Sequence, residues 1–178
     1  MTDLLFTPLT IGTLEVKNRI FMPAMHLNMA RNYQVTDRLL DFYAARAQGG
    51  AGMITVGYAS VDELSAYPAH IGAHRDEYLP GLASLAKVIQ QGGARAALQL
   101  NHAGRYNHSM ALGGEKPVAP SPIASRLTGE TPRELTTDEI QQIIAAFAAA
   151  AVRVKTAGFD AVEILAGTGY LISEFLSP

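Results

Sequence analysis

The sequence has no cysteine among its 178 residues. This absence excludes disulfides, thiolate metal sites, iron–sulfur ligation by this chain and cysteine nucleophiles. His70 and His74 have a metal-ligand spacing, but they lie in a predicted loop without further ligands, so no metal site is expected. With 14 basic and 16 acidic residues the formal net charge is −2. A near-neutral chain lacks the basic face that nucleic-acid binding requires, so no nucleic-acid partner is expected.

Long apolar runs are also missing. No stretch reaches the roughly 18–20 residues that a membrane span needs. The first eight residues lack the basic and apolar regions of a signal peptide. We therefore expect a cytoplasmic protein without a membrane partner. A composition of 48% hydrophobic and 17% charged residues is typical of a globular chain with one domain.

Predicted strands and helices alternate along the chain. A hairpin over 9–16 comes first, and a short strand over 19–22 ends at Pro23 because proline has no amide donor. Three further apolar strands are predicted, with Gly57 ending the first of them: 52–56, 96–100 and 160–164. Helical periodicity predicts four helices, the first capped by Thr36: 37–48, 78–91, 135–156 and 170–176.

This order predicts an α/β fold with a parallel sheet covered by helices. An open doubly wound sheet and a (β/α)8 barrel both fit the pattern. The segment 101–134 is rich in glycine, proline and serine and shows no clear element. It follows the third strand of the sheet, at the catalytic face of either architecture, and loops of this length are usually functional or disordered.

Polar residues follow the predicted strands and should converge at one end of the sheet. The amide of Gln99 both donates and accepts, so it suits a flat heterocycle with a carbonyl beside an N–H, or a core position bonded to backbone. His26, His102 and Arg105 can bind an anionic group. Alternatively, Arg105 holds the long loop 101–134 in place and His102 forms a hydrogen bond with backbone. Tyr170 precedes a helix, where a phenol can donate a proton, and the positive helix end should lower its pKa. It can equally be a packing residue.

Several motifs occur together in this chain. They are Lys17-Asn-Arg-Ile-Phe-Met-Pro23, Gln99-Leu-Asn-His-Ala-Gly-Arg105, Gly158-Phe-Asp-Ala-Val-Glu-Ile164 and Gly169-Tyr-Leu-Ile-Ser-Glu-Phe-Leu-Ser-Pro178. In this order and spacing they resemble the old yellow enzyme family of FMN-dependent ene reductases. The resemblance implies a (β/α)8 TIM barrel with FMN at the carboxyl ends of its strands. Residues 1–178 would then be the N-terminal half of that domain, with the hairpin and the first four βα units.

The resemblance also assigns residues to the cofactor. It implies that six of them bind FMN: Pro23, Ala24, Met25, His26, Gly57 and Gln99. His26 stands where family members carry a threonine or cysteine that tunes the flavin, which implies a changed redox potential. Met25, His26 and Tyr170 favour the bacterial 2,4-dienoyl-CoA reductase branch, in which the tyrosine matching Tyr170 is the proton donor. Tyr170 and His26 are therefore the candidate catalytic residues.

One pair of positions departs from the family pattern. Most members carry two histidines, or a histidine and an asparagine, after the fourth strand, and these side chains bind the substrate carbonyl. Leu165 and Thr168 occupy those positions here, and leucine cannot donate a hydrogen bond. The resemblance therefore favours a substrate whose carbonyl is polarised elsewhere, such as a dienoyl thioester.

The implied function is reduction of an activated C=C bond of a small molecule with electrons from NAD(P)H. The alternatives are a flavin-dependent amine dehydrogenase or demethylase of the same family, or a fragment that is inactive without its second half. The expected partner is a C-terminal half barrel or second segment, and a homo-oligomer is also possible. FAD and a 4Fe-4S cluster, present in the longer reductases, would lie in that C-terminal part.

Overall fold

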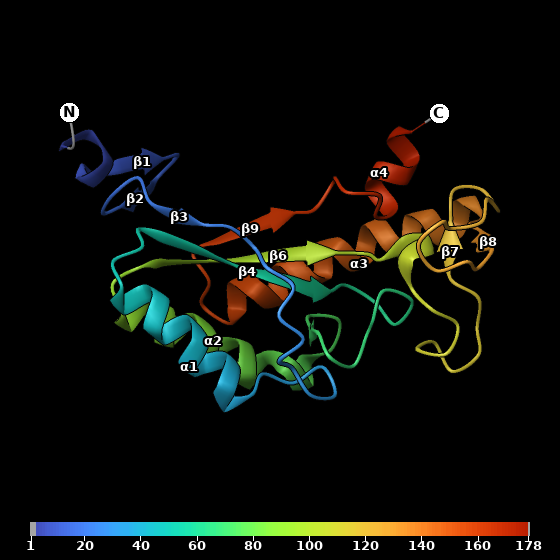
Figure 1. Ribbon diagram of the computed structural model, residues 1–178, viewed down its shortest axis with the longest axis horizontal. Helices are drawn as coiled ribbons and strands as arrows, with labels where there is room; N and C mark the ends of the chain where they lie inside the picture. Colours follow the sequence, from blue (N-terminus) through green and yellow to red (C-terminus); the bar gives the residue numbers. More distant parts are fainter. Residues whose placement is uncertain (1–2, 178) are drawn as a thin grey trace.

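The computed structural model describes residues 3–177 (Figure 1). Met1, Thr2 and Pro178, to which the predicted domain extends, lie outside the described residues. After the short helix η1 (Asp3–Phe6), strands β1 (Leu9–Ile11) and β2 (Leu14–Val16) pair antiparallel. The predicted hairpin is confirmed.

A parallel sheet organises the rest of the chain. Its main path contains β3 (Phe21–Met22), β4 (Met53–Ser60), β6 (Arg95–Asn101) and β9 (Ala161–Ile164). Neighbouring strands pair in chain order, β3-β4-β6-β9, and all three pairings are parallel. A doubly wound sheet reverses its strand order at a switch point, and this sheet does not. The order is that of a barrel, of which the chain forms the first part.

Helices connect these strands. They are α1 (Asp37–Gln48), α2 (Leu79–Gln91), α3 (Thr137–Thr156) and α4 (Leu171–Leu176). The hydroxyl of Thr36 accepts from the N–H of Leu39 and caps α1, as predicted, while Thr136 and Glu139 form a reciprocal capping box at α3. No helix within residues 3–177 is long and apolar enough to cross a membrane.

The predicted end of the second strand at Gly57 is wrong, because β4 continues to Ser60. Its register with β6 shifts between Val56 and Ala59, so Gly57 lies within a bulge. A Cβ at Gly57 would lie 2.9 Å from the Cα atom of Ala24. Glycine here permits close packing of the segment after β3 and does not form a turn.

Short elements occupy segments that carried no sequence signal. Strand β5 (Ile71–Gly72) pairs with the end of β4, and helix η2 (Asp76–Tyr78) precedes α2. The segment 101–134, expected to lack elements, contains η3 (Gly104–Tyr106) and β7 (Val118–Ala119). Strand β7 pairs parallel with β8 (Arg133–Glu134). Strands of two residues are too short to show periodicity.

The two faces of the sheet have different neighbours. Helices α1, α2 and α3 cover the outer face (Figure 1), where the main core includes Ile54, Val56, Leu98 and Leu100. On the inner face Met53 and Ala97 pack with Val16 of the hairpin. Because side chains alternate along a strand, Thr55 and Gln99 also face the interior of the incomplete barrel. This alternation positions polar side chains for a site.

Candidate functional site

A cavity of about 250 Å³ opens at the carboxyl ends of the strands. Most of the residues that line it carry aromatic rings and come from three loops, β4 and the start of α4: His26, Tyr58, Tyr67, His70, Tyr106, His108 and Tyr170. The two predicted catalytic residues, His26 and Tyr170, therefore share one cavity. Gln99 is not among the described residues that line it. The convergence expected from the strand ends is confirmed for His26 and Tyr170.

His26 and His70 form a closely contacting pair. Their Nε2 atoms lie 2.5 Å apart, and the two rings are nearly perpendicular. His26 Nε2 also lies 3.0 Å from Asn28 Oδ1. Burial and the neighbouring His26 lower the pKa of His70 from 6.5 to about 3, so His70 is neutral at pH 7. Only one of two facing Nε2 atoms can donate across this contact, so the other ring nitrogen must accept.

Tyr170 is half-buried, with its ring edge-on to Tyr58 and Tyr106 at centroid distances of 5.7 Å each. Burial, with a smaller effect of Tyr106, raises the pKa of Tyr170. The expectation that the helix end lowers this pKa is wrong. Helix α4 has only six residues, and desolvation of the phenolate outweighs its weak dipole. The Tyr170 hydroxyl is therefore protonated at neutral pH.

Gln99 lies on the inner face of β6 and is 8% exposed. Its Nε2 donates to Oε1 of Glu163, its register partner on β9, at 2.5 Å. The second carboxylate oxygen of Glu163 accepts from the Thr55 hydroxyl at 3.3 Å. The sequence also allowed Gln99 to be a core residue whose amide is hydrogen-bonded to backbone. The structure differs, because the partner of the amide nitrogen is the side-chain carboxylate of Glu163.

The segment after β3 presents open main chain. Within residues 3–177 the N–H and C=O groups of 24–28 make no hydrogen bond. Pro23, Met25 and His26 are exposed, and Ala24 packs on Gly57. Unpaired main-chain donors and acceptors in this segment, and the amide of Gln99 on the inner face of β6, suit the polar edges of a flat heterocycle. These residues fit such a cofactor.

His102 and Arg105 have structural contacts. His102 is 1% exposed, its Nδ1 accepts from the N–H of Gly104 at 3.0 Å, and its Nε2 lies 3.3 Å from Asp62 Oδ2. Arg105 Nε lies 3.8 Å from Glu174 Oε1, which also accepts the Arg105 N–H at 3.0 Å. Both residues hold the loop after β6, as the structural alternative proposed.

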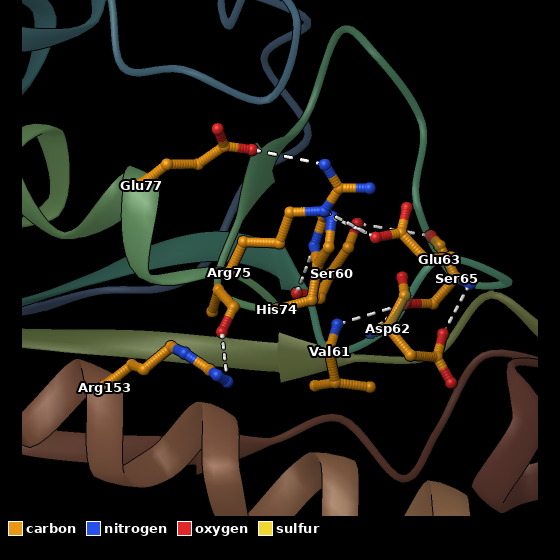
Figure 2. Close-up of polar contacts among 10 residues, drawn as sticks. Ser60, Val61, Asp62, Glu63, Ser65, His74, Arg75, Glu77 and Arg153 are labelled. Atoms are coloured by element: carbon orange, nitrogen blue, oxygen red, sulfur yellow. Dashed lines mark hydrogen bonds and ion pairs between the residues drawn. The ribbon is translucent and has the colours of Figure 1, made fainter.

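Polar contacts also fix the loop that carries His70 (Figure 2). The Ser65 hydroxyl accepts from the N–H groups of Val61 and Asp62 at 3.0 and 3.1 Å. Arg75 Nε donates to Glu63 Oε1 at 2.7 Å. The loop therefore returns to β4 in a defined shape and places His70 against His26.

The sequence did not predict several residues of this region, among them Tyr58, Tyr67, His70, Tyr106 and Glu163. His70 was considered only as a metal ligand, and no group of three acidic or histidine side chains within residues 3–177 could hold a metal ion. A charged residue inside an otherwise apolar parallel strand was an available signal for Glu163.

The two positions that depart from the family pattern lie in the loop between β9 and α4. Leu165 is half-buried and its N–H donates to Leu100 O at 3.1 Å. Thr168 is exposed and has a φ of +59°. A β-branched residue is rare in this left-handed region, and such strain is concentrated at functional sites.

The chain is similar to known proteins in sequence and in fold. Residues 4–178 match the NADH:flavin oxidoreductase / NADH oxidase family. The chain is 54% identical over 176 residues to a metal reductase from Desulforamulus reducens, covering 99% of this chain and 26% of that protein. It is 40% identical over 176 residues to an NADPH dehydrogenase from Clostridium acetobutylicum, covering 98% of this chain and 51% of that protein.

The structure of a 2-naphthoyl-CoA reductase bound to 2-naphthoyl-CoA is similar, with a TM-score of 0.93 at 34% identity. That match covers 99% of this chain and 29% of the other. The chain thus spans between about a quarter and a half of the length of these relatives.

Proposed function

The chain belongs to the NADH:flavin oxidoreductase / NADH oxidase family, the old yellow enzyme family, and from this premise we propose that it is the N-terminal half of an FMN-binding barrel domain. The proposed activity of the whole protein is reduction of an activated C=C bond with electrons from NAD(P)H. One observation carries the proposal. His26 and Tyr170, on segments 144 positions apart, line one cavity beside main chain that has no hydrogen-bond partner in residues 3–177.

We assign the cofactor to the inner face of the sheet. The open main chain at Pro23, Ala24, Met25 and His26 would bind polar edges of FMN, and Gly57 lets this segment approach β4. Gln99 would bind the pyrimidine edge through its carboxamide. The chemistry that FMN supplies when bound is hydride transfer from NAD(P)H to the double bond.

We assign the proton transfer to Tyr170. Its hydroxyl keeps its proton at neutral pH because burial raises its pKa. As hydride adds to one carbon of the double bond, Tyr170 donates this proton to the neighbouring carbon, and solvent restores it. The substrate gains two electrons, NAD(P)H loses two, and no other oxidant is required. His26, whose Nε2 atom contacts that of His70, would stabilise negative charge beside the reacting atoms.

We propose a thioester such as a 2,4-dienoyl-CoA as the substrate class. Leu165 cannot donate to a substrate carbonyl, and the Thr168 hydroxyl is the only donor of that pair of side chains. The similar 2-naphthoyl-CoA reductase, as its name says, acts on an acyl-CoA. A thioester whose carbonyl is polarised by groups outside residues 165–168 would not need hydrogen-bond donors at Leu165 and Thr168.

We also propose that a second half barrel pairs with the free edge of β9. Val162 and Ile164 on this strand are 38% and 48% exposed, although β-strands of this apolar type are normally covered. A 4Fe-4S cluster needs cysteine ligands, which residues 1–178 lack, so we propose that it would lie in further sequence, such as the longer relatives have, together with FAD.

Single-turnover kinetics test the assigned proton donor. In the full polypeptide that contains residues 1–178, Tyr170→Phe should slow oxidation of prereduced enzyme by a dienoyl-CoA by about 10²–10⁴-fold. Reduction of the enzyme by NAD(P)H should change little. Tyr78→Phe is the control, because Tyr78 packs with Tyr33 and His74 outside the cavity. An unchanged rate of substrate reduction in Tyr170→Phe would refute the donor role.

The electron donor distinguishes the alternative function. Reduction of the bound flavin by amines instead of NAD(P)H would favour the amine dehydrogenase alternative.

A further inference from the structure

Glu163 is an acidic side chain on the interior side of a parallel sheet. It accepts hydrogen bonds from Gln99 and Thr55, which lie on two different strands. None of the ion pairs formed within residues 3–177 includes Glu163. Its described contacts are therefore to neutral donors, and the shorter of them, at 2.5 Å, is to the amide of Gln99. A charged acceptor on a neutral donor makes a stronger bond than a neutral acceptor does.

The chemistry of the two groups determines how Gln99 is oriented. A carboxamide can be turned so that either its oxygen or its nitrogen faces a neighbour. An ionised carboxylate only accepts hydrogen bonds, so the nitrogen of Gln99 must face Glu163. One N–H is used in this contact. We take this N–H to be the one that points away from the carbonyl. The carbonyl oxygen and the second N–H then remain side by side, which is the pattern that pairs with a ring N–H next to a ring carbonyl.

We infer that Glu163 is a positioning residue for the cofactor: it holds the carboxamide of Gln99 in the one orientation that offers an acceptor and a donor together to the pyrimidine edge of FMN. This inference rests on the proposed function. Glu163 itself does not need to touch the cofactor, and its contribution passes through Gln99. Because Thr55 binds the other carboxylate oxygen, the carboxylate is held from both sides.

The test uses FMN affinity of the full polypeptide after removal and titration of the cofactor. The variants are Glu163→Leu, Glu163→Gln, Gln99→Leu and the double variant Glu163→Leu/Gln99→Leu. Thr55→Val is the matched control, since it removes the second partner of the carboxylate and leaves Gln99 in contact. The thermal midpoint of each cofactor-free protein checks that the fold is retained.

We expect Glu163→Leu and Gln99→Leu each to weaken FMN binding about tenfold, the effect of losing one hydrogen bond to a charged or polar partner. The double variant should be weakened about tenfold as well, not a hundredfold, because both changes remove the same interaction. Glu163→Gln should stay within about threefold of wild type, since its carbonyl still accepts from Gln99. Its bound flavin should have a more positive reduction potential, because a negative charge is gone. Thr55→Val should stay within about twofold.

Effects of Glu163→Leu and Gln99→Leu that multiply in the double variant would overturn the inference, because independent losses show that Glu163 does not act through Gln99. Wild-type affinity in a folded Glu163→Leu would overturn it too. If Glu163→Leu fails to fold, Glu163→Gln provides the test. A loss of FMN affinity as large as that of Gln99→Leu would contradict the inference. Retained FMN affinity with a more positive flavin reduction potential would support it. Failure of the proposed function is a different result, namely a folded wild-type protein that does not bind FMN.

Discussion

At the scale of single residues, His70 is a buried imidazole that cannot easily take a proton. Its Nδ1 has no hydrogen-bond partner in residues 3–177, and its Nε2 faces His26. Burial first, and His26 second, lower the pKa of His70 to about 3 in the folded protein. In the unfolded chain the group titrates near its ordinary value of 6.5. The unfolded state therefore binds more protons as the pH falls from 6.5 towards 3, and this favours unfolding.

We predict that His70→Gln flattens the acid side of the stability profile. Below pH 6.5 wild type should lose up to about 1.4 kcal/mol per pH unit through this group, and the variant should not. Urea unfolding at pH 7.5, 5.5 and 4.5 measures the difference. Gln141→Ala, at an exposed position of α3, serves for comparison, because it changes no titratable group and its profile should follow wild type. Parallel profiles for wild type and His70→Gln would show that His70 is not held neutral by the fold.

Some residues of the site could be predicted from the sequence and others could not. His26 and Tyr170 follow predicted strands, so the convergence of parallel strand ends was enough to bring them together. His70 and Glu163 were missed for different reasons. His70 reaches the site through a loop whose path depends on Ser65 and Arg75, and long-range loop contacts have no local sequence pattern. The charge of Glu163 within an apolar strand is visible in the sequence, but its contact with Gln99 depends on the register of β9 against β6, which no single strand reveals.

At the scale of elements, helix α4 is joined to the loop after β6 by a buried carboxyl group. Glu174 in its first turns accepts the N–H of Arg105 through Oε1, and its Oε2 is buried without a partner in residues 3–177. Burial raises the pKa of Glu174 to about 7, although the Arg105 N–H and charge oppose this. Between pH 4.5 and 7 the folded protein thus holds a proton that the unfolded chain releases. Stability through this group is present below pH 4.5 and is lost as the pH rises through 7.

We predict that Glu174→Gln is more stable than wild type at pH 8, by on the order of 2 kcal/mol, and about equal at pH 4.5. The neutral amide keeps an oxygen for the Arg105 N–H and has no charge to desolvate. Chemical denaturation at the two pH values provides the measurement. Glu115→Gln is the control, because Glu115 is exposed on a loop, and it should not increase the stability at pH 8. A Glu174→Gln protein less stable than wild type at pH 8 would mean that the ion pair with Arg105 outweighs burial.

The longer elements were predictable, and their ends were less so. The helices α1 and α3 begin where Thr36 and Thr136 supply capping oxygens, a signal that lies within a few residues. The end of β4 was predicted wrongly at Gly57, because a glycine in a bulge and a glycine in a turn look the same in sequence. Close approach of Ala24 decides between them, and that contact is tertiary.

At the scale of the whole molecule, the strand order separates two architectures that periodicity leaves equal. Four strands in chain order form an incomplete barrel whose last strand, β9, has an open edge. Beside this edge an apolar groove of about 470 Å³ runs between α3, β9 and α4, lined entirely by aliphatic and phenylalanine side chains. Ile144, Ile164 and Phe175 in this groove are between 46% and 56% exposed. Exposed apolar patches of this kind mark interfaces.

We predict that residues 1–178 produced alone associate with themselves, while the full polypeptide does not use this surface. The isolated chain should elute well above its mass of 19.0 kDa and bind a hydrophobic dye, since both the strand edge and the groove are uncovered. Ile164→Lys places a charge in the groove and should reduce both signals in the isolated chain. Ile123→Lys is the matched control, because Ile123 is also exposed, at 61%, but is not among the described residues that line the groove. In the full polypeptide, Ile164→Lys should instead destabilise the fold, because a second half barrel would bury this position. An isolated chain that is monomeric and binds no dye would contradict the idea that this face is built to be covered.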